Sequence, residues 1–382
     1  MSAAALTLRG ARVLWPDGIG PGDLSLSGGV ITEKPQPRVV DLGGFLVLPG
    51  IVDAHGDAFE RHLAPRRGAM TDPARGLIAC EAELAANGIT TATLAQFYSW
   101  EGGLRGPEFA ARMLAALAEA RPRVATDLRA QLRVEVAMID AYADIEALIA
   151  RFDIGYVVFN DHLPHASLAA GKRPQRLTGQ ALRIGRNPEM HLEIMRGLHD
   201  RMPEVDAALD ALATNLSAAG VRLGSHDDQT PDARLRHRAR GARIAEFPET
   251  LEAAEAARAG GDAVIMGAPN VMRGGSHNGN AGALDMVAAG HVDALASDYH
   301  YPSLAGAAFR LVETGTLDLA GAWRLVSAGP ARVLGLVDRG ALHPGLRADL
   351  VVVDPDARRV VATLAEGRVS YMTGAAAARF IG

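Results

Sequence analysis

Apolar runs of strand length alternate with amphipathic stretches of helix length through the middle of the chain. The runs end at or near His55, Leu94, Val136, Phe159, Ser225, Glu246, Met266 and Ser297. The helical stretches between them cover residues 76–87, 107–119, 189–201, 207–219, 248–257 and 282–289. Strands that alternate with helices indicate a parallel sheet. Eight such units predict a (β/α)8 TIM barrel over residues 49–337.

A doubly wound open sheet is the main alternative to the barrel. Dinucleotide-binding sheets of that kind carry a GxGxxG fingerprint directly after the first strand. The sequence after the run that ends at His55 has no such fingerprint. The barrel is therefore favoured.

The two ends of the chain, residues 1–48 and 338–382, differ from the middle. They consist of short apolar runs separated by turns, and the Gly28–Gly29 pair predicts a hairpin. One run is expected to continue from residue 39 to 48. Neither end can bury enough apolar surface alone, so we expect both to join in one small β-sandwich domain beside the barrel.

Composition narrows the possible partners and compartments. The net charge of −5 gives no support for nucleic-acid binding, and the single cysteine, Cys80, excludes an internal disulfide. There is no apolar stretch of about twenty residues and no signal-peptide pattern at the start. We expect a cytoplasmic protein without a nucleic-acid or membrane partner. The oligomeric state stays open, with a homodimer as one option.

His55 and Asp57 form an HxD motif at the end of the first apolar run of the barrel region. Side chains at positions i and i+2 of an extended segment point to the same side. An imidazole and a carboxylate together suit zinc, manganese or iron. Alone, such a short motif is more often a strand end that happens to carry polar residues.

Other predicted barrel strands end in similar side chains. In a barrel, all of these ends face one mouth, where TIM-barrel active sites lie. They are Asn160, Asp161 and His162 after the fourth strand; His226, Asp227 and Asp228 after the fifth; Glu246 on the sixth; and Asp298, Tyr299 and His300 after the eighth. A helix-capping role is an equal alternative for Asp228. Several carboxylates at one mouth would repel each other without a cation, so the set predicts a divalent metal centre.

A glycine-rich loop follows the seventh predicted strand, where TIM barrels often bind phosphate. Glycine lets backbone N–H groups approach phosphate oxygens, and an arginine offers a bidentate fork. The predicted substrate contacts in this loop are Asn270, Arg273, Gly274, Gly275, Ser276 and His277. An ordinary connecting loop is the alternative.

The pattern resembles the amidohydrolase superfamily over essentially the whole chain. The run LPGIVDAH (residues 48–55), the later His226 and Asp298, and the closing LHPGLRADLVVVD (342–354) carry the resemblance. Six blocks resemble one subfamily of diphosphatases in phosphonate catabolism. They are HGDAFERH (55–62), FNDH (159–162), SHDDQT (225–230), AEFPETLEAA (245–254), MGAPNVMRGGSHNGN (266–280) and ASDY (296–299).

The chain departs from the usual superfamily pattern at three positions. Asp57 replaces the second histidine of the common HxH motif, and Glu246 stands where the sixth strand often carries histidine. A bridging carboxylated lysine is absent, because the only lysines, Lys34 and Lys172, lie away from the end of the fourth strand. If two metals bind, Asp161 or another carboxylate must bridge them.

The resemblance implies a hydrolase that releases diphosphate from a ribose 5-triphosphate, a small phosphorylated-sugar substrate. It implies one or two divalent ions, zinc first, with manganese and iron as alternatives. The implied metal ligands are His55, Asp57, Asp161, His226, Glu246 and Asp298. The implied catalytic residues are His226 and Asp298, the latter as general base or acid.

Further basic residues offer contacts to the triphosphate. Arg61 and His62 match the first block and are expected to bind substrate. His162 is expected either to contact substrate or to orient a ligand. Arg66 and the segment 171–176 are equally well explained as solvated loop residues.

Two other functions remain open at this stage. The first is a hydrolase of a C–N bond in a cyclic amide or a deaminase-type substrate, which would need fewer basic groups. The second is a member that has lost its metal and acts as a scaffold, although ligand types at nearly every strand end argue against it.

Overall fold

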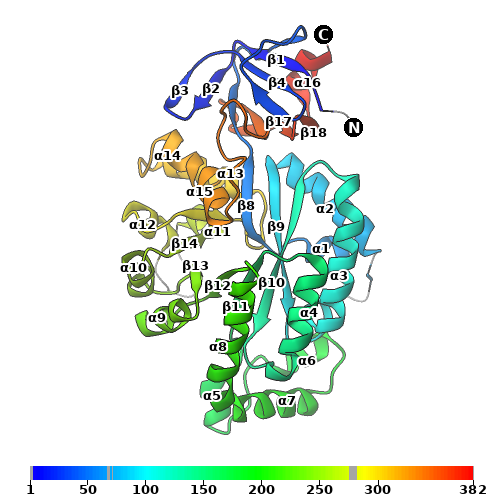
Figure 1. Cartoon of the computed structure of the whole chain (residues 1–382), viewed down its shortest axis with the longest axis vertical. Coiled ribbons are helices and arrows are strands. Elements are labelled where there is room, and N and C mark those ends of the chain that lie inside the picture. Colours follow the sequence, from blue (N-terminus) through cyan, green and yellow to red (C-terminus); the bar gives the residue numbers. More distant parts are fainter. Residues whose placement is uncertain (1–2, 67–68, 71, 275–281, 382) are drawn as a thin grey trace.

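A barrel of parallel strands with helices around it is the main body of the computed structural model, which describes residues 3–66, 69–70, 72–274 and 282–381. A small β-domain that contains both termini covers one end of the barrel (Figure 1). The eight-stranded sheet runs in chain order: β8 (Ile51–Gly56), β9 (Ile89–Tyr98), β10 (Asp127–Glu135), β11 (Tyr156–Asn160), β12 (Arg222–His226), β13 (Ala242–Glu246), β14 (Ala263–Gly267) and β15 (Ala294–Ala296). The predicted (β/α)8 fold is confirmed.

The first and last strands close the ring at the residues just beyond them. The backbone N–H of Asp298 donates to the carbonyl of His55 at 3.0 Å, and the N–H of Asp57 donates to the carbonyl of Asp298 at 2.8 Å. The same junction between the first and last strands has a side-chain connection. The buried Asp53 carboxylate of β8 accepts hydrogen bonds from the backbone N–H and the hydroxyl of Ser297. Chain closure therefore places the first and eighth strand ends side by side.

Most helices pack their apolar faces on the outside of the barrel, where they enclose the main core, whereas α16 packs in the small domain (Figure 1). Several begin at a side-chain cap, including Asp72, Asn187, Thr230, Thr250 and Asp318. The helices are α1 (Glu60–Leu63), α2 (Pro73–Ala86), α3 (Pro107–Ala120), α4 (Tyr142–Phe152), α5 (His165–Ala169), α6 (Leu177–Arg183), α7 (Pro188–Asp200), α8 (Met202–Ala218), α9 (Pro231–Ala239), α10 (Leu251–Ala259), α11 (Ala268–Arg273), α12 (Ala283–Ala288), α13 (Ser303–Glu313), α14 (Leu319–Arg324), α15 (Ala328–Val333) and α16 (Gly374–Ile381). The 3₁₀ turns are η1 (Gly103–Arg105), η2 (Arg121–Arg123) and η3 (Ile139–Ala141).

None of the helices in the described part of the chain combines the length and the apolar character needed to cross a bilayer.

The small domain consists of two sheets around a separate apolar cluster that includes Leu6, Leu26 and Val352. One sheet has the order β5 (Val30–Thr32), β4 (Leu24–Ser27), β1 (Leu6–Arg9) and β6 (Val39–Asp41). The other has the order β18 (Arg368–Met372), β17 (Arg359–Ala365), β16 (Leu350–Asp354), β7 (Leu46–Pro49), β2 (Arg12–Trp15) and β3 (Gly18–Pro21). Since β7 pairs with β16, the two ends of the chain do join in one domain.

Two turns shape this domain. Gly28 and Gly29, with φ of 61° and 85°, connect β4 and β5 as the predicted hairpin. The run from residue 39 to 48 was expected to be continuous, but the structure divides it between β6 and β7. Gly44 has a φ of 92°, so the chain turns there and passes from one sheet to the other.

A buried ion cluster fixes the outer side of β12 and β13. Arg234 on α9 is fully buried, and its guanidinium lies 3.1 Å from Asp228 and 3.5 Å from Asp262. It also donates to the Ser225 hydroxyl at 2.6 Å. Asp228 therefore acts inside the fold, as the partner of a buried arginine.

Replacing this arginine should destabilise the protein strongly. Arg234→Ala leaves the buried Asp228 carboxylate without its guanidinium and removes one of the cations beside Asp262, which is expected to lower the free energy of unfolding by about 3–5 kcal/mol. Urea unfolding followed by circular dichroism measures it. Arg236→Ala, on the exposed side of the same helix, is the control and should change stability by less than about 0.5 kcal/mol. Equal effects of both substitutions would contradict the assignment.

Candidate active site

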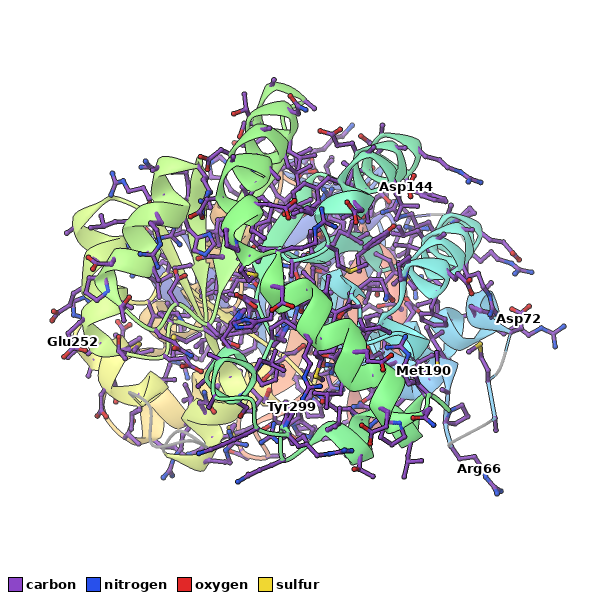
Figure 2. All side chains as sticks on the ribbon, turned by 90° about the horizontal axis from the view of Figure 1, so that it is seen from below. Arg66, Asp72, Asp144, Met190, Glu252 and Tyr299 are labelled. Carbon is purple, nitrogen blue, oxygen red and sulfur yellow. The ribbon has the colours of Figure 1, made fainter. Side chains whose placement is uncertain are left out.

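A cavity of about 330 Å³ lies at the carboxyl ends of the barrel strands. This is the end of the barrel away from the small domain, and Figure 2 views the molecule from that side. Polar side chains from widely separated strands line the cavity: Asp57, Arg105, Arg133, His162, His226, Asp227, Glu249, Asn270, Arg273, Asp298 and Tyr299. It has the position expected of a TIM-barrel active site.

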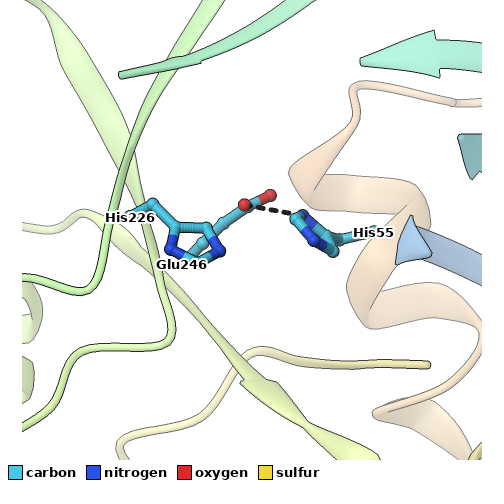
Figure 3. Close-up of side chains that lie close together, drawn as sticks. All are labelled: His55, His226 and Glu246. Carbon is cyan, nitrogen blue, oxygen red and sulfur yellow. Dashed lines mark hydrogen bonds and ion pairs between the residues drawn. The ribbon is translucent and has the colours of Figure 1, made fainter. Parts of the chain in front are cut away.

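His55 and Glu246 form a buried pair next to the cavity (Figure 3). His55 Nδ1 lies 2.8 Å from Glu246 Oε2, and both side chains are fully buried. The other oxygen of Glu246 accepts hydrogen bonds of 2.6 Å from Gln131 and from the Tyr156 hydroxyl. Burial opposes the charged form of His55, but the Glu246 carboxylate outweighs it and raises the pKa of His55.

The outer nitrogen of His55, Nε2, is buried and has no hydrogen-bond partner among the described residues. Metal-binding histidines typically donate one ring N–H to a carboxylate and present the other nitrogen to the ion. The His55–Glu246 pair has this arrangement. The donor set therefore fits a divalent cation, with His55 Nε2 as one ligand.

His162 and Glu135 form a second pair of the same kind. Glu135, fully buried at the end of β10, accepts a short hydrogen bond from His162 Nδ1 and one of 3.1 Å from the His162 backbone N–H. The carboxylate fixes both the ring and the backbone of His162. Like His55, this ring can present Nε2 to the cavity.

His226 lies between these two histidines. Its ring centroid is 5.5 Å from that of His55 and 6.3 Å from that of His162. Burial, supported by the charge of Arg133, lowers the pKa of His226 and so favours the neutral, metal-binding form. Among the described residues, two groups have ligand atoms within 4.8 Å of one another, and the groups share His226. One consists of His55, His226 and Glu246, and the other of His162, His226 and Asp227.

Asp57 and Asp298 line the same cavity from the seam of the barrel. Burial and then the charge of Asp57 raise the pKa of Asp298 to about 6. Asp298 has a left-handed backbone with a φ of 55°, as do Asp227 at 58° and Phe247 at 53°. Each of these three residues comes directly after, or two positions after, a barrel strand. Such strained positions cluster at functional sites.

The structure brings together His55, Asp57, His226, Glu246 and Asp298 from the predicted ligand set, but it places Asp161 elsewhere. The Asp161 carboxylate is paired with His165 Nε2 at 2.9 Å and accepts from the Leu163 backbone N–H at 3.2 Å. It is about one-third exposed and belongs to neither ligand group. These contacts hold the Asp161 side chain away from the ligand groups, although His162 next to it lines the cavity.

Arg61 and His62 do not line the cavity as the structure describes it. Both contact Glu83 on α2, His62 at 2.7 Å and Arg61 through a short ion pair. Arg61 also donates to the Tyr299 carbonyl at 3.2 Å. Both side chains are directed to a helix carboxylate next to the mouth. Arg66 projects from the edge of the molecule (Figure 2).

The loop after β14 contributes two of its predicted residues to the cavity. Asn270 and Arg273 line it, and Arg273 contacts the Tyr299 hydroxyl. Gly274 ends α11 with a φ of 74°. The predicted contacts Gly275, Ser276 and His277 lie outside the described residues.

Contributors to the site that were not predicted from the sequence include Arg105, Gln131, Arg133, Glu135, Tyr156 and Glu249. Three of them alternate along β10, and alternating residues of a strand share a face. The polar series Gln131-Leu-Arg133-Val-Glu135 was the signal, because the interior of such a barrel is usually filled by apolar branched residues.

Comparisons with known proteins agree with this geometry. No protein-family model matches the chain. The α-D-ribose 1-methylphosphonate 5-triphosphate diphosphatase of Escherichia coli (strain K12) is 31% identical over 360 residues, which cover 91% of this chain and 94% of that protein. The chain belongs to the amidohydrolase superfamily, in the same family as this diphosphatase.

Solved structures show the same fold at low sequence identity. N-acetylglucosamine-6-phosphate deacetylase from Pasteurella multocida has a TM-score of 0.62 and 11% identity, with 96% of this chain and 100% of that chain covered. A mutant atrazine chlorohydrolase from Arthrobacter aurescens TC1, complexed with zinc and atraton, has a TM-score of 0.60 and 15% identity over 96% and 95% of the two chains. The chain is thus a hydrolase of this superfamily with a candidate His/Glu/Asp metal site.

The role of Glu246 can be tested through metal affinity. Glu246→Gln keeps the size of the side chain but removes the charge that orients His55, so zinc should bind about 10–100-fold more weakly. Competition with a chromophoric chelator measures the dissociation constant. Glu252→Gln, at an exposed position on α10, is the matched control and should bind zinc like the parent. Unchanged affinity in the Glu246 variant would rule out the proposed pairing.

Proposed function

We propose that this protein is a metal-dependent diphosphatase that cleaves α-D-ribose 1-methylphosphonate 5-triphosphate in phosphonate catabolism. The observation that carries the proposal is one cavity in which a histidine cluster and three arginines, Arg105, Arg133 and Arg273, occur together. The 31% identity to the E. coli diphosphatase supports this substrate. The zinc in the atrazine chlorohydrolase structure supports zinc as the first candidate metal.

The charges around the cavity suit an anionic substrate only when a cation is bound. The lining has four carboxylates, from Asp57, Asp227, Glu249 and Asp298, and three arginines, which gives a formal charge of 3 − 4 = −1. One divalent ion changes this to +1, and a second makes it more positive. A highly charged phosphate ester would be repelled from the metal-free site and attracted to the loaded one.

In the proposed reaction a water oxygen forms a bond to the α phosphorus while the bond between this phosphorus and the oxygen bridging to the β phosphorus breaks. The products are the 5-phosphate and diphosphate, which leaves with the bonding electron pair. A bound divalent ion would lower the pKa of a water molecule and neutralise charge on the phosphoryl oxygens. His55 and His226 are the first residues expected to hold the ion, with Asp57, Asp298, Glu246 and His162 around them.

Residues of the chain transfer the proton, stabilise the developing charge and orient the histidines. Asp298, which lines the cavity at the end of the eighth strand, accepts the proton of the attacking water. Arg133 faces the same region and stabilises the charge that develops on phosphorus-bound oxygens. Glu246 and Glu135 keep the two outer histidines in orientation.

Removing the proposed base should abolish most turnover. Asp298→Asn keeps a side chain that tolerates the left-handed backbone, and kcat should fall at least about 100-fold. Phosphorus NMR of released diphosphate measures turnover, and elemental analysis measures retained zinc. Near-normal turnover with full zinc content would show that another group manages the proton.

Hydrolysis of a C–N bond is the second candidate, because the fold is shared with enzymes such as a dihydropyrimidinase from Brevibacillus agri, at a TM-score of 0.52 and 13% identity. A neutral cyclic amide would not need three arginines around the cavity. Incubation with both substrate classes and a divalent metal, followed by phosphorus NMR and an assay of released amine, separates the two. A third outcome is a zinc content well below one equivalent per chain that does not rise when zinc or manganese is added. It would favour a protein that has lost its metal and acts as a scaffold.

A further inference from the structure

Two arginines stack on the aromatic ring of Phe97 at the wall of the cavity. Phe97 lies near the end of β9 and is only 2% exposed. The guanidinium carbon of Arg133 is 3.9 Å from the centroid of its ring, and that of Arg105 is 4.2 Å away. Guanidinium groups stack well on aromatic rings because they are planar and weakly hydrated. The ring therefore holds two like charges beside the same cavity.

The two arginines are tied to different parts of the site. Arg133 is buried, and its NH2 lies 3.0 Å from His226 Nε2, with NH1 3.7 Å from Asp57. Among the described residues, Arg105 is paired with Glu101, at 3.1 Å through NH1, and not with the histidine cluster. Its backbone is fixed as well, since the Arg105 carbonyl accepts from the Ser99 N–H at 2.7 Å. Arg133 is thus the inner cation and Arg105 the outer one.

Arg105 still has donors to offer. Its side chain is 33% exposed and lines the cavity, and within the described part of the chain Nε and NH2 have no hydrogen-bond partner. A guanidinium that is held by stacking and by one carboxylate loses little further freedom when it binds an anion. This is the arrangement of a preformed anion site.

Two neighbouring cations on one wall suit an anion with charge on successive groups. A single phosphate or carboxylate would contact one of them and leave the free donors of the other unused. A polyphosphate places negative oxygens on adjacent phosphoryl groups, so both arginines can form charge-assisted hydrogen bonds at once.

We propose that the Phe97-stacked pair is the polyphosphate-binding element of this cavity, in which Arg133 binds the phosphoryl group under attack and Arg105 binds the departing diphosphate. The inference rests on the proposed function. It adds Arg105 as a specificity-determining residue that was not among the predicted substrate contacts, and it pairs Arg105 with Arg133.

Binding of inorganic triphosphate to the zinc-loaded protein, measured by isothermal titration calorimetry, tests the proposal without turnover of the sugar ester. Arg105→Gln should weaken triphosphate binding about 10–100-fold, because one charge-assisted contact is lost. Arg105→Lys keeps the charge but not the fork, so it should recover binding only partly. Arg112→Gln removes an exposed arginine of α3 that does not line the cavity, and it should bind triphosphate like the parent.

Inorganic monophosphate provides the second probe. Since Arg105 is assigned to the diphosphate part, Arg105→Gln should change monophosphate binding far less than triphosphate binding, whereas Arg133→Gln should weaken both. Thermal unfolding and zinc content of each variant identify misfolded protein, and Arg105→Lys provides the comparison if the glutamine variant is unstable. If Arg105→Gln and Arg105→Lys bind triphosphate as tightly as the parent, the assignment is overturned.

The outcome is distinguishable from failure of the proposed function. If the parent hydrolyses the ribose triphosphate but Arg105 variants bind triphosphate normally, the diphosphatase stands and the arginine assignment fails. If the variants lose triphosphate binding but the parent releases no diphosphate from the sugar ester, the anion site stands and the substrate is wrong.

Discussion

Backbone hydrogen bonds between the first and last strands of the barrel are the constraint on which the site depends. They join His55, Asp57 and Asp298 directly, so closure of the ring and assembly of the cavity are one event. In an open sheet with the same strand order, the strands that carry these residues would lie at opposite edges. The buried Asp53 carboxylate is hydrogen-bonded to Ser297. It adds a side-chain connection between the two strands next to His55 and Asp298.

The interior of this barrel is unusually polar for a packed core. Gln131, Tyr156 and Glu246 form one buried network, and Glu135 lies beside it. Such groups are stabilising only when they are well paired, and a loss of one partner leaves another without compensation. The network therefore orients His55 and His162 rigidly. The large apolar core between strands and helices provides the stability that this polar centre does not.

Sequence periodicity was sufficient for the fold and for part of the site. His55, His226 and Glu246 could be predicted because each ends an apolar run, and strand ends meet at one mouth. Arg133 and Glu135 were not predicted, because the prediction used only residues just past the strand ends and these two belong to β10 itself. Asp161, Arg61 and His62 are set by contacts with His165 and Glu83. Those contacts depend on how helices pack and on the direction of a turn, which local sequence does not specify.

The position of the seam has a consequence for biosynthesis. The ribosome produces β8 first among the barrel strands and β15 last, so a nascent chain has no closed ring until nearly the whole barrel has been translated. Until then, a growing parallel sheet exposes two unpaired edges, which can pair with other chains. Prematurely terminated fragments of this protein should accordingly be targets for chaperones and proteases, because they cannot complete the ring.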